Sequence, residues 1–253
     1  MTAIRDRALS ILELLAAHVE GLSLSDISDR LNIPRSATHR VLNDLREMGY
    51  VKQNESTSHY ALTVKLAALG LSYLSATGIN DISQPILDEL AEKSAELVRL
   101  AIFEENQLIW IAKAQGAKTG LRYDPDAGIE VYFPATATGM AWLAAHSKEQ
   151  ALELTIHQGF EKAKRMGPNA PVTIDALLGE IEKTKEQGYA WMVDTYVEGT
   201  SSVAMVIADK NGGKPMGVLT VSGPSVRFNE EAMRNVLPDL KQAVFTLSQV
   251  RKN

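Results

Sequence analysis

A short run of polar and basic residues carries the clearest chemistry in this sequence. Arginine guanidinium groups bind guanine edges or phosphates, and short hydroxyl side chains bind phosphates or base edges. If such a run lies on one face of a helix whose other face is apolar, it suits the major groove of DNA. The residues expected to contact DNA are Arg35, Ser36, Thr38, His39 and Arg40. For each of them the alternative is a solvated helix face.

The sequence around this run predicts a winged helix-turn-helix over residues 22–62. Ser23 and Asp26 are spaced to cap a short helix. Pro34 presets the backbone for the start of a second helix, and Gly49 would end it. The apolar face of the second helix consists of Ala37, Val41, Leu42, Leu45 and Met48. The alternative for this segment is a structural or protein-docking domain of three helices.

Flanking elements are expected to complete the domain and to join it to the rest of the chain. A first helix is predicted over 4–18, the wing strands over 50–53 and 59–62, the polar wing tip over 54–58, and a second long helix over 62–76. In that last helix, Leu66, Leu69 and Tyr73 are expected to be buried, either against the first domain or against a partner chain.

The remainder of the chain has mixed helix and strand patterns, which predict an α+β domain after a boundary near residue 78. The predicted strands are 97–103, 108–114, 121–123, 203–208 and 216–222. The predicted helices are 82–94, 138–146, 148–157, 174–187 and 229–250. Residues 104–107 and 209–213 are hairpin signals, and 161–171 reads as a loop.

Composition narrows the class of protein. The chain has 253 residues, 45% of them hydrophobic, and a net charge of −5. Residues 1–65 carry equal numbers of acidic and basic side chains, so DNA binding would depend on a few well-placed groups rather than on bulk charge. The absence of cysteine excludes disulfides and thiolate nucleophiles, and the five histidines lack metal-ligand spacing. Because no apolar stretch reaches about 20 residues, we expect a cytoplasmic protein without a membrane span.

Several separated motifs resemble those of the IclR family of bacterial transcription regulators. They are the string over 31–40, Gly49-Tyr50-Val51, Tyr60-Ala61-Leu62, the stretch over 134–141, Gly188-Tyr189-Ala190 ahead of Glu198-Gly199, and Val221-Ser222-Gly223-Pro224 ahead of Arg227-Phe228. The resemblance covers nearly the whole chain. It implies a winged helix-turn-helix DNA-binding domain over 1–62, a linker helix over 63–78, and a GAF-like effector-binding domain with an antiparallel sheet over 79–253.

The resemblance also implies an effector pocket between the sheet and the turn over 134–139. The residues expected to bind the ligand are Ala137, Thr138, Met192, Ser202, Thr220, Ser222, Trp110 and Arg122. Met192 stands where the family often has a carboxylate, which favours a more apolar pocket and an acid with an aromatic body. Arg99 or Arg122 would need an anion if it pointed inward, and each could equally face solvent. Trp110 and Trp191 are candidates for the apolar wall or for ordinary core.

These features predict a transcriptional regulator of a catabolic operon rather than an enzyme. Its expected partners are double-stranded operator DNA, a small organic acid and further copies of itself, as a homodimer or tetramer. Neither a cofactor nor a metal is expected. The alternatives are a hydrolase or transferase with a vestigial DNA-binding domain and a constitutive DNA binder with no effector. Repressor and activator remain equally open.

Overall fold

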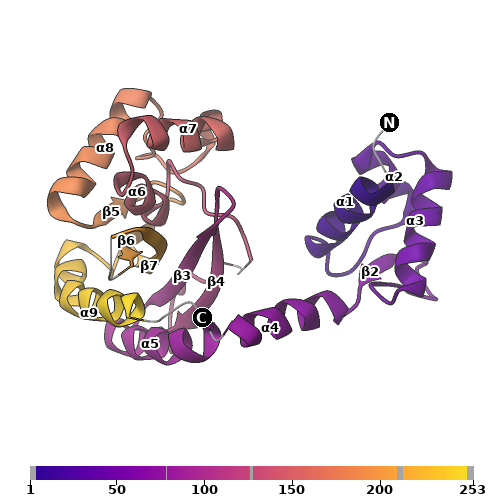
Figure 1. Cartoon of the computed structure of the whole chain (residues 1–253), viewed down its shortest axis with the longest axis horizontal. Helices are drawn as coiled ribbons and strands as arrows, with labels where there is room; N and C mark the ends of the chain where they lie inside the picture. The colour runs from indigo at the N-terminus through magenta and orange to yellow at the C-terminus, as the bar shows by residue number, and fades with distance from the viewer. Residues whose placement is uncertain (1–3, 78, 126–127, 210–212, 250–253) are drawn as a thin grey trace. The chain divides into compact units, whose positions relative to one another are not determined.

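The computed structural model describes residues 4–77, 79–125, 128–209 and 213–249. The centre of the predicted turn over 209–213 and the last residue of the predicted C-terminal helix lie outside these ranges. The chain divides into two compact units, Met1–Thr77 and Gly78–Asn253. Figure 1 labels the elements of both units.

The first unit contains three helices and a two-stranded hairpin. The elements are α1 (Ile4–Ala16), α2 (Leu24–Leu31), α3 (Arg35–Glu47), β1 (Val51–Gln53) and β2 (Tyr60–Leu62). The two strands pair antiparallel, as predicted for a wing. Apolar side chains from all five elements form one core. The predicted winged helix-turn-helix architecture is therefore present.

Local signals in the sequence set the ends of these helices. Ser23 precedes α2, and its side-chain oxygen accepts a hydrogen bond from the backbone N–H of Asp26 at 3.1 Å. Pro34 precedes α3 and has φ −54°, close to helical values. Beyond α3, Gly49 adopts φ +79°, and the N–H of Tyr50 returns to the carbonyl of Leu45 at 2.9 Å. Glycine suits this left-handed position because it has no Cβ.

Helix α4 (Lys65–Thr77) follows the wing and closes the first unit. Leu66 is half-buried, whereas the side chains of Leu69 and Tyr73 are 50% and 61% exposed. The alternative in which Leu69 and Tyr73 pack against the first domain is therefore wrong. Burial against a partner chain remains a prediction, because the structure contains a single chain.

The second unit is built on a five-stranded antiparallel sheet. The strands are β3 (Leu97–Glu104), β4 (Gln107–Gln115), β5 (Ala190–Val193), β6 (Thr200–Ala208) and β7 (Pro215–Pro224). Their order across the sheet is β4-β3-β7-β6-β5. Strands β3 and β7 are neighbours although more than a hundred residues separate them in the chain, so the sheet joins distant segments.

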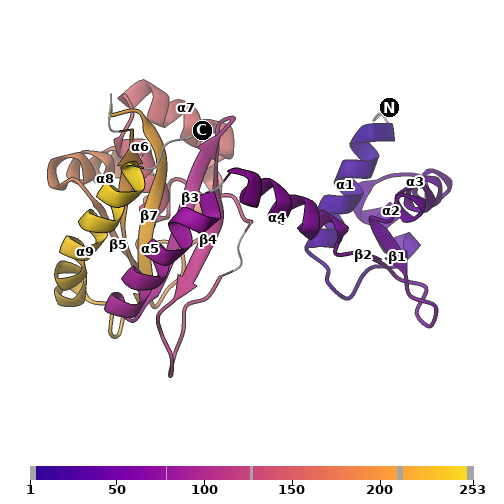
Figure 2. The ribbon, with the colours of Figure 1, turned by 60° about the horizontal axis from the view of Figure 1, so that its bottom comes forward.

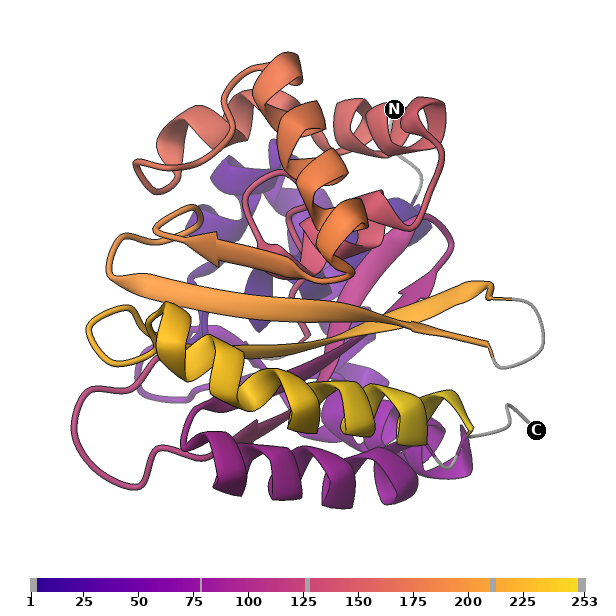
Figure 3. The same cartoon turned by 90° about the vertical axis from the view of Figure 1, so that its left-hand side faces the viewer.

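Helices cover both faces of this sheet (Figure 3). Helices α5 (Ile79–Ser94) and α9 (Glu230–Ser248) pack on one face. The helices of the other face are α6 (Ala137–Ala144), α7 (Lys148–Gln158) and α8 (Ile174–Gln187), with a 3₁₀ turn at Phe160–Arg165. Each face has its own apolar core, so the second unit has three layers.

Three sequence predictions in this unit need correction. Residues 121–123 are irregular rather than a strand, and Leu121 is 65% exposed. Residues 190–193 form the edge strand β5, which was not predicted. Part of the predicted loop over 161–171 is the 3₁₀ turn. In the described part of the chain, no helix is both long and apolar enough to cross a lipid bilayer.

Candidate functional site

Helix α3 presents most of the predicted DNA-contacting residues to solvent. Arg35, Ser36, His39 and Arg40 are all exposed. The opposite face of the helix is buried in the core of the first unit through Val41, Leu42 and Leu45, among others. A helix held by one face and exposing short polar and basic groups on the other has the geometry that major-groove binding requires.

Thr38 is the exception, and its prediction as a DNA-contacting residue is wrong. Its side chain is 0% exposed. The Thr38 hydroxyl donates to the carbonyl of Pro34 at 3.2 Å and lies 3.4 Å from that of Ile33. Thr38 precedes Val41 and Leu42 by three and four residues, so helical geometry places it on the buried face with them.

Two further groups lie on this surface beside the residues expected to contact DNA. Asn43 contacts the ring of His39, with their side-chain nitrogens 3.3 Å apart. The Arg46 guanidinium donates to the side-chain oxygen of Gln53 in β1 at 3.1 Å, which joins α3 to the wing. Asn43 and Arg46 follow His39 by four and seven residues, so the helical repeat places both on the same face as His39. This repeat predicts the position of Asn43 on that face from the sequence, and it could have identified Arg46 as well.

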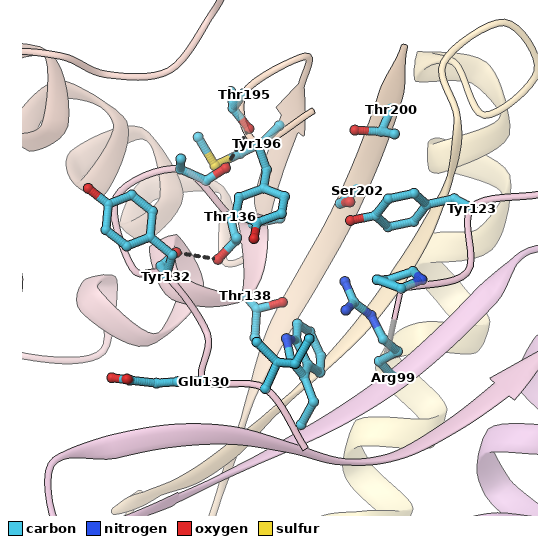
Figure 4. Close-up of a pocket in the computed structure, with 16 residues that line it drawn as sticks. Arg99, Tyr123, Glu130, Tyr132, Thr136, Thr138, Thr195, Tyr196, Thr200 and Ser202 are labelled. Carbon is cyan, nitrogen blue, oxygen red and sulfur yellow. Dashed lines mark hydrogen bonds between the residues drawn. The ribbon is translucent and has the colours of Figure 1, made fainter. Parts of the chain in front are cut away.

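A cavity in the second unit lies between the sheet and the segment that leads into α6 (Figure 4). It contains about 590 Å³ of space, its open mouth included. Its lining residues are Arg99, Trp110, Tyr123, Pro125, Ile129, Glu130, Tyr132, Ala135, Thr136, Ala137, Thr138, Met192, Thr195, Tyr196, Thr200 and Ser202.

Arg99 is the only cation among these described lining residues. Its guanidinium carbon lies 3.8 Å from the centre of the Trp110 ring and 5.7 Å from that of Tyr123. Arg99 is 8% exposed, and its Nε has no hydrogen-bond partner in the described part of the chain. Within that part, no carboxylate lies at salt-bridge distance from Arg99.

Burial shifts the ionisation of both Arg99 and Tyr123. Desolvation lowers the pKa of Arg99, and the nearby Tyr123 hydroxyl partly opposes this shift. Desolvation also raises the pKa of Tyr123, so its phenol stays protonated and can donate a hydrogen bond. A buried cation without an acidic partner is costly. A ligand carboxylate would supply the missing charge and accept the unused N–H of Arg99.

The register of the sheet brings the predicted hydroxyl residues to the same face as Arg99. Thr220 is the cross-strand partner of Arg99, and Ser222 is the partner of Ser202. Thr138 at the start of α6 faces these strands, and its Oγ1 lies 2.7 Å from the Oγ1 of Thr220. Strands that are distant in the sequence thus form one polar wall.

Thr220 and Ser222 lie behind this wall rather than in it. They are 1% and 0% exposed and do not line the cavity. The Ser202 hydroxyl donates to the Ser222 oxygen at 2.8 Å. Their predicted direct ligand contact is therefore wrong: Thr220 and Ser222 support Thr138 and Ser202, which line the cavity themselves.

The structure also places the other six predicted ligand residues. Ala137, Met192 and Trp110 line the cavity together with Thr138 and Ser202. Arg122 does not, because it is exposed in the irregular segment after β4 and donates to the carbonyl of Lys118 at 2.6 Å. Its prediction as a ligand residue is wrong.

Trp191 also lies outside the cavity. Successive residues of a strand point to opposite faces, so Met192 faces the cavity and Trp191 faces the core beneath α9. There the Trp191 ring packs edge-on against Phe228, with ring centres 5.7 Å apart. Trp191 is therefore core.

Loops supply the lining residues that the sequence prediction missed, including Tyr123, Tyr132, Thr136 and Tyr196. Thr136 also caps α6, because its Oγ1 accepts from the N–H of Gly139 at 2.9 Å. The Tyr132 hydroxyl donates to the carbonyl of Gly159 at 3.0 Å. The cap pattern before α6 was readable, but no local signal shows which loop side chains face a cavity. Among the described residues, no cluster of His, Asp or Glu side chains could hold a metal ion.

Comparison with known proteins agrees with this architecture. The model of the IclR helix-turn-helix domain matches residues 6–55, and that of the bacterial transcriptional regulator IclR C-terminal domain matches residues 71–249. The chain is 27% identical over 227 residues to the acetate operon repressor of Salmonella typhimurium, covering 89% of this chain and 81% of that one.

Solved structures share the fold. An IclR transcriptional regulator from Alicyclobacillus acidocaldarius superposes with a TM-score of 0.84 at 20% identity, covering 98% of both chains. An IclR homologue from Microbacterium hydrocarbonoxydans, complexed with 4-hydroxybenzoate, gives a TM-score of 0.80 at 19% identity, covering 97% of this chain and 98% of that one. Together the two family models match most of the sequence, and the chain belongs to the IclR family of bacterial transcriptional regulators.

Proposed function

We propose that this regulator changes its affinity for operator DNA when a small organic acid with an aromatic body occupies the cavity of the second unit. The observation that carries the proposal is Arg99. A buried guanidinium whose Nε is unused, and which has no acidic partner among the residues that the structure describes, needs an anion. The operon it controls is proposed to be catabolic, with the acid as a substrate or intermediate.

The walls of the cavity favour a flat apolar body on this acid. Trp110 and Tyr123 flank Arg99, and Met192 adds an apolar side chain to the lining of the cavity. Rings stack on one another and on guanidinium planes, so an aromatic carboxylate would gain from both groups. The complex of the Microbacterium homologue with 4-hydroxybenzoate supports the same class of ligand.

The hydroxyls of Thr138 and Ser202 would complete the recognition of the acid. Both line the cavity, and each is oriented by the residue behind it, Thr220 or Ser222. Hydrogen bonds to a charged group contribute more than bonds between neutral groups. We therefore assign Arg99 to the charge of the carboxylate and the two hydroxyls to its orientation.

On the DNA side, we propose that a homodimer reads two half-sites through two copies of α3. One winged helix reads too few base pairs for useful specificity. The DNA-contacting residues of this proposal are Arg35, Ser36, His39 and Arg40. The exposed Leu69 and Tyr73 of α4 would be covered by the partner chain. Replacing Leu69 with Glu should then produce a monomer with weak operator binding, and sedimentation that still shows a dimer would contradict this interface.

The acid proposal is tested by ligand binding in solution. Benzoate and 4-hydroxybenzoate should raise the melting temperature increasingly as their concentration exceeds Kd, whereas benzamide, a neutral molecule of similar shape, should not. Butyrate, which has the charge without the ring, should bind more weakly. If benzamide stabilises the protein as well as benzoate does, Arg99 does not select for charge and the proposal fails.

The effect on DNA is measured with an operator obtained by selection from random duplexes. Bound acid must change operator affinity. An effector can do this only if it binds the DNA-competent and the DNA-incompetent conformations of the protein with different affinities. An acid that binds without altering operator affinity would overturn the regulatory part of the proposal. If the protein binds the acid but does not convert it to a product, the result favours a regulator over the enzyme alternative. The curated relatives, which are repressors, also favour a regulator.

A further inference from the structure

A loop over residues 116–125, which we call the strap, forms one wall of the cavity. Figure 2 shows it leaving β4 as a long segment with neither helix nor strand. Most of its side chains are exposed, including Leu121 at 65%. Tyr123 and Pro125 point inward and line the cavity. The strap is thus a surface loop on its outer side and a binding-site wall on its inner side.

Side chains, rather than a backbone ladder, fasten this strap. In the described part of the chain, no backbone-to-backbone hydrogen bond holds residues 118–125. The Lys113 ammonium on β4 donates to Asp124 Oδ1 at 2.7 Å and to the Pro125 carbonyl at 3.3 Å. Gln115 Nε2 donates to the Tyr123 carbonyl at 3.2 Å. Segments held this way open locally at low free-energy cost.

The other attachment of the strap is firmer. The Arg227 Nη1 donates to the Leu121 carbonyl at 2.7 Å. The same guanidinium forms a two-pronged pair with Glu96, at 2.6 and 2.9 Å. The Glu96 side chain is 5% exposed, so this pair is anchored in the protein. By contrast, the side chains of Lys113 and Asp124 are 37% and 46% exposed, and a pair of this kind is weak.

The strap covers the group that an acid must reach. Trp110 covers one side of the Arg99 guanidinium, and Tyr123 of the strap lies near it at 5.7 Å (Figure 4). With the strap in place Arg99 is 8% exposed. A ligand carboxylate must exchange with water at this guanidinium. Displacement of Tyr123 is the movement that would uncover it.

We propose that the strap is a gate over Arg99, with Arg227 as its anchor and the Lys113–Asp124 pair as its latch. Release of the latch lets the part of the strap that carries Tyr123 move away while Leu121 stays attached. Lys113 is then a positioning residue that sets how fast ligands exchange. This inference rests on the proposed function for the identity of the ligand, but the gating of the cavity can be measured without any ligand.

The absence of cysteine from the chain makes that measurement direct. In Ser202→Cys the only thiol lines the cavity and is half-buried, so the rate at which neutral iodoacetamide labels it measures access to the cavity. Labelling is followed by mass spectrometry of the intact protein. Lys113→Met and Asp124→Asn, each added to this background, should speed labelling about two- to fivefold, as expected from the loss of a partly exposed ion pair. Thr200→Cys is the second reporter if Ser202→Cys does not fold.

Matched variants separate gating from general loosening. Lys118→Met removes an exposed lysine of the strap that contributes only its backbone carbonyl to the interactions described, and it should leave labelling unchanged. Lys113→Arg should restore the parental rate because it can re-form the pair. Combining Lys113→Met with Asp124→Asn should add little to Lys113→Met alone, since that change already removes the ion pair together with the bond to the Pro125 carbonyl. Equal labelling rates in Lys113→Met and the parent overturn the gate.

Benzoate then distinguishes this inference from the proposed function. If both hold, benzoate slows labelling, and Lys113→Met raises its dissociation rate by the same two- to fivefold. Protection is read from Thr200→Cys, which keeps the Ser202 hydroxyl. If its labelling responds to the latch but benzoate gives no protection, the gate stands and the acid assignment fails. If benzoate protects while the latch variants label like the parent, the acid assignment stands and the gate is overturned.

Discussion

The two surfaces of this regulator are assembled in different ways. The proposed DNA surface takes Arg35, Ser36, His39 and Arg40 from successive turns of one helix. The cavity takes Arg99 from β3, Trp110 from β4, Met192 from β5 and Ser202 from β6, and it is completed by loops. A helix fixes the neighbours of each residue through its own period, whereas a sheet fixes them only once the register between strands is set.

This difference also appears in how each surface holds its polar groups. The arginines of α3 are exposed and keep their hydration until DNA arrives. Arg99 has already lost most of its water and lies between two aromatic rings. Substitutions in the cavity should therefore change both binding and the stability of the free protein, whereas those on α3 should change binding alone.

The largest expected effect comes from Arg99→Met. Loss of hydrogen bonds to a charged group should weaken benzoate by about 1.5–3 kcal/mol, or roughly 10- to 100-fold. The free protein should be as stable as the parent or more so, because an apolar side chain replaces a buried cation that has no acidic partner in the described part of the chain. Calorimetric titration and thermal unfolding measure the two quantities.

Arg122→Met is the matched control. It removes an arginine from the exposed strap, where the guanidinium has the Lys118 carbonyl as its one hydrogen-bond partner among the described residues. Benzoate affinity should stay within experimental error. Equal losses in the two variants would mean that overall charge, rather than Arg99, attracts the acid.

The next effect concerns α3. Arg40→Ala should weaken operator binding by about 1–3 kcal/mol if its guanidinium contacts a base. Thr38→Val should leave operator affinity unchanged, because its hydroxyl is bonded inside the unit, and should instead lower stability slightly. Titrations of labelled operator at fixed salt test both variants. A loss of affinity in Thr38→Val with unchanged stability would contradict its buried assignment.

The outcome for these residues shows which features of the protein could be predicted from the sequence. The helix ends at Ser23, Pro34 and Gly49 could be predicted because each signal is local. Thr38 was misplaced because the polar run was read as a string, although its spacing from Val41 already put it on the buried face. The family likeness placed the pocket near the start of α6, and Ala137 and Thr138 do line it.

The rest of the cavity could not be derived from local signals. The start of β3 reads Leu97-Val98-Arg99-Leu100-Ala101, and all five residues are buried, so alternation does not show which face Arg99 takes. Its pairing with Thr220 decides that. Arg122 looked equally suitable, but its segment is a loop outside the sheet. Tyr123 lies next to it in the same loop and points inward, and only the three-dimensional path of the strap distinguishes the two.

A smaller effect on overall stability is expected at the anchor of the strap. Arg227→Met leaves Glu96 buried without its partner, which should lower the free energy of unfolding by about 1–3 kcal/mol. The loss should be smaller than for a fully buried pair, because the Arg227 side chain is 37% exposed. Adding Glu96→Met should recover part of this loss. Chemical denaturation measures both. An Arg227→Met protein as stable as the parent would show that the anchor is weak.

The smallest effect is expected at Ser222. Its side chain does not reach the cavity but accepts the hydrogen bond that orients Ser202. Ser222→Ala should weaken benzoate by less than about 1 kcal/mol, because the ligand keeps its contact with Ser202 and only the orientation of that hydroxyl is lost. Ser202→Ala should cost more. The double variant should equal Ser202→Ala alone, since Ser222 acts through Ser202 and the two changes are then non-additive. If Ser222→Ala weakens benzoate further when Ser202 is already alanine, Ser222 contacts the ligand directly, and the cavity must extend one layer deeper between β6 and β7 than this structure shows.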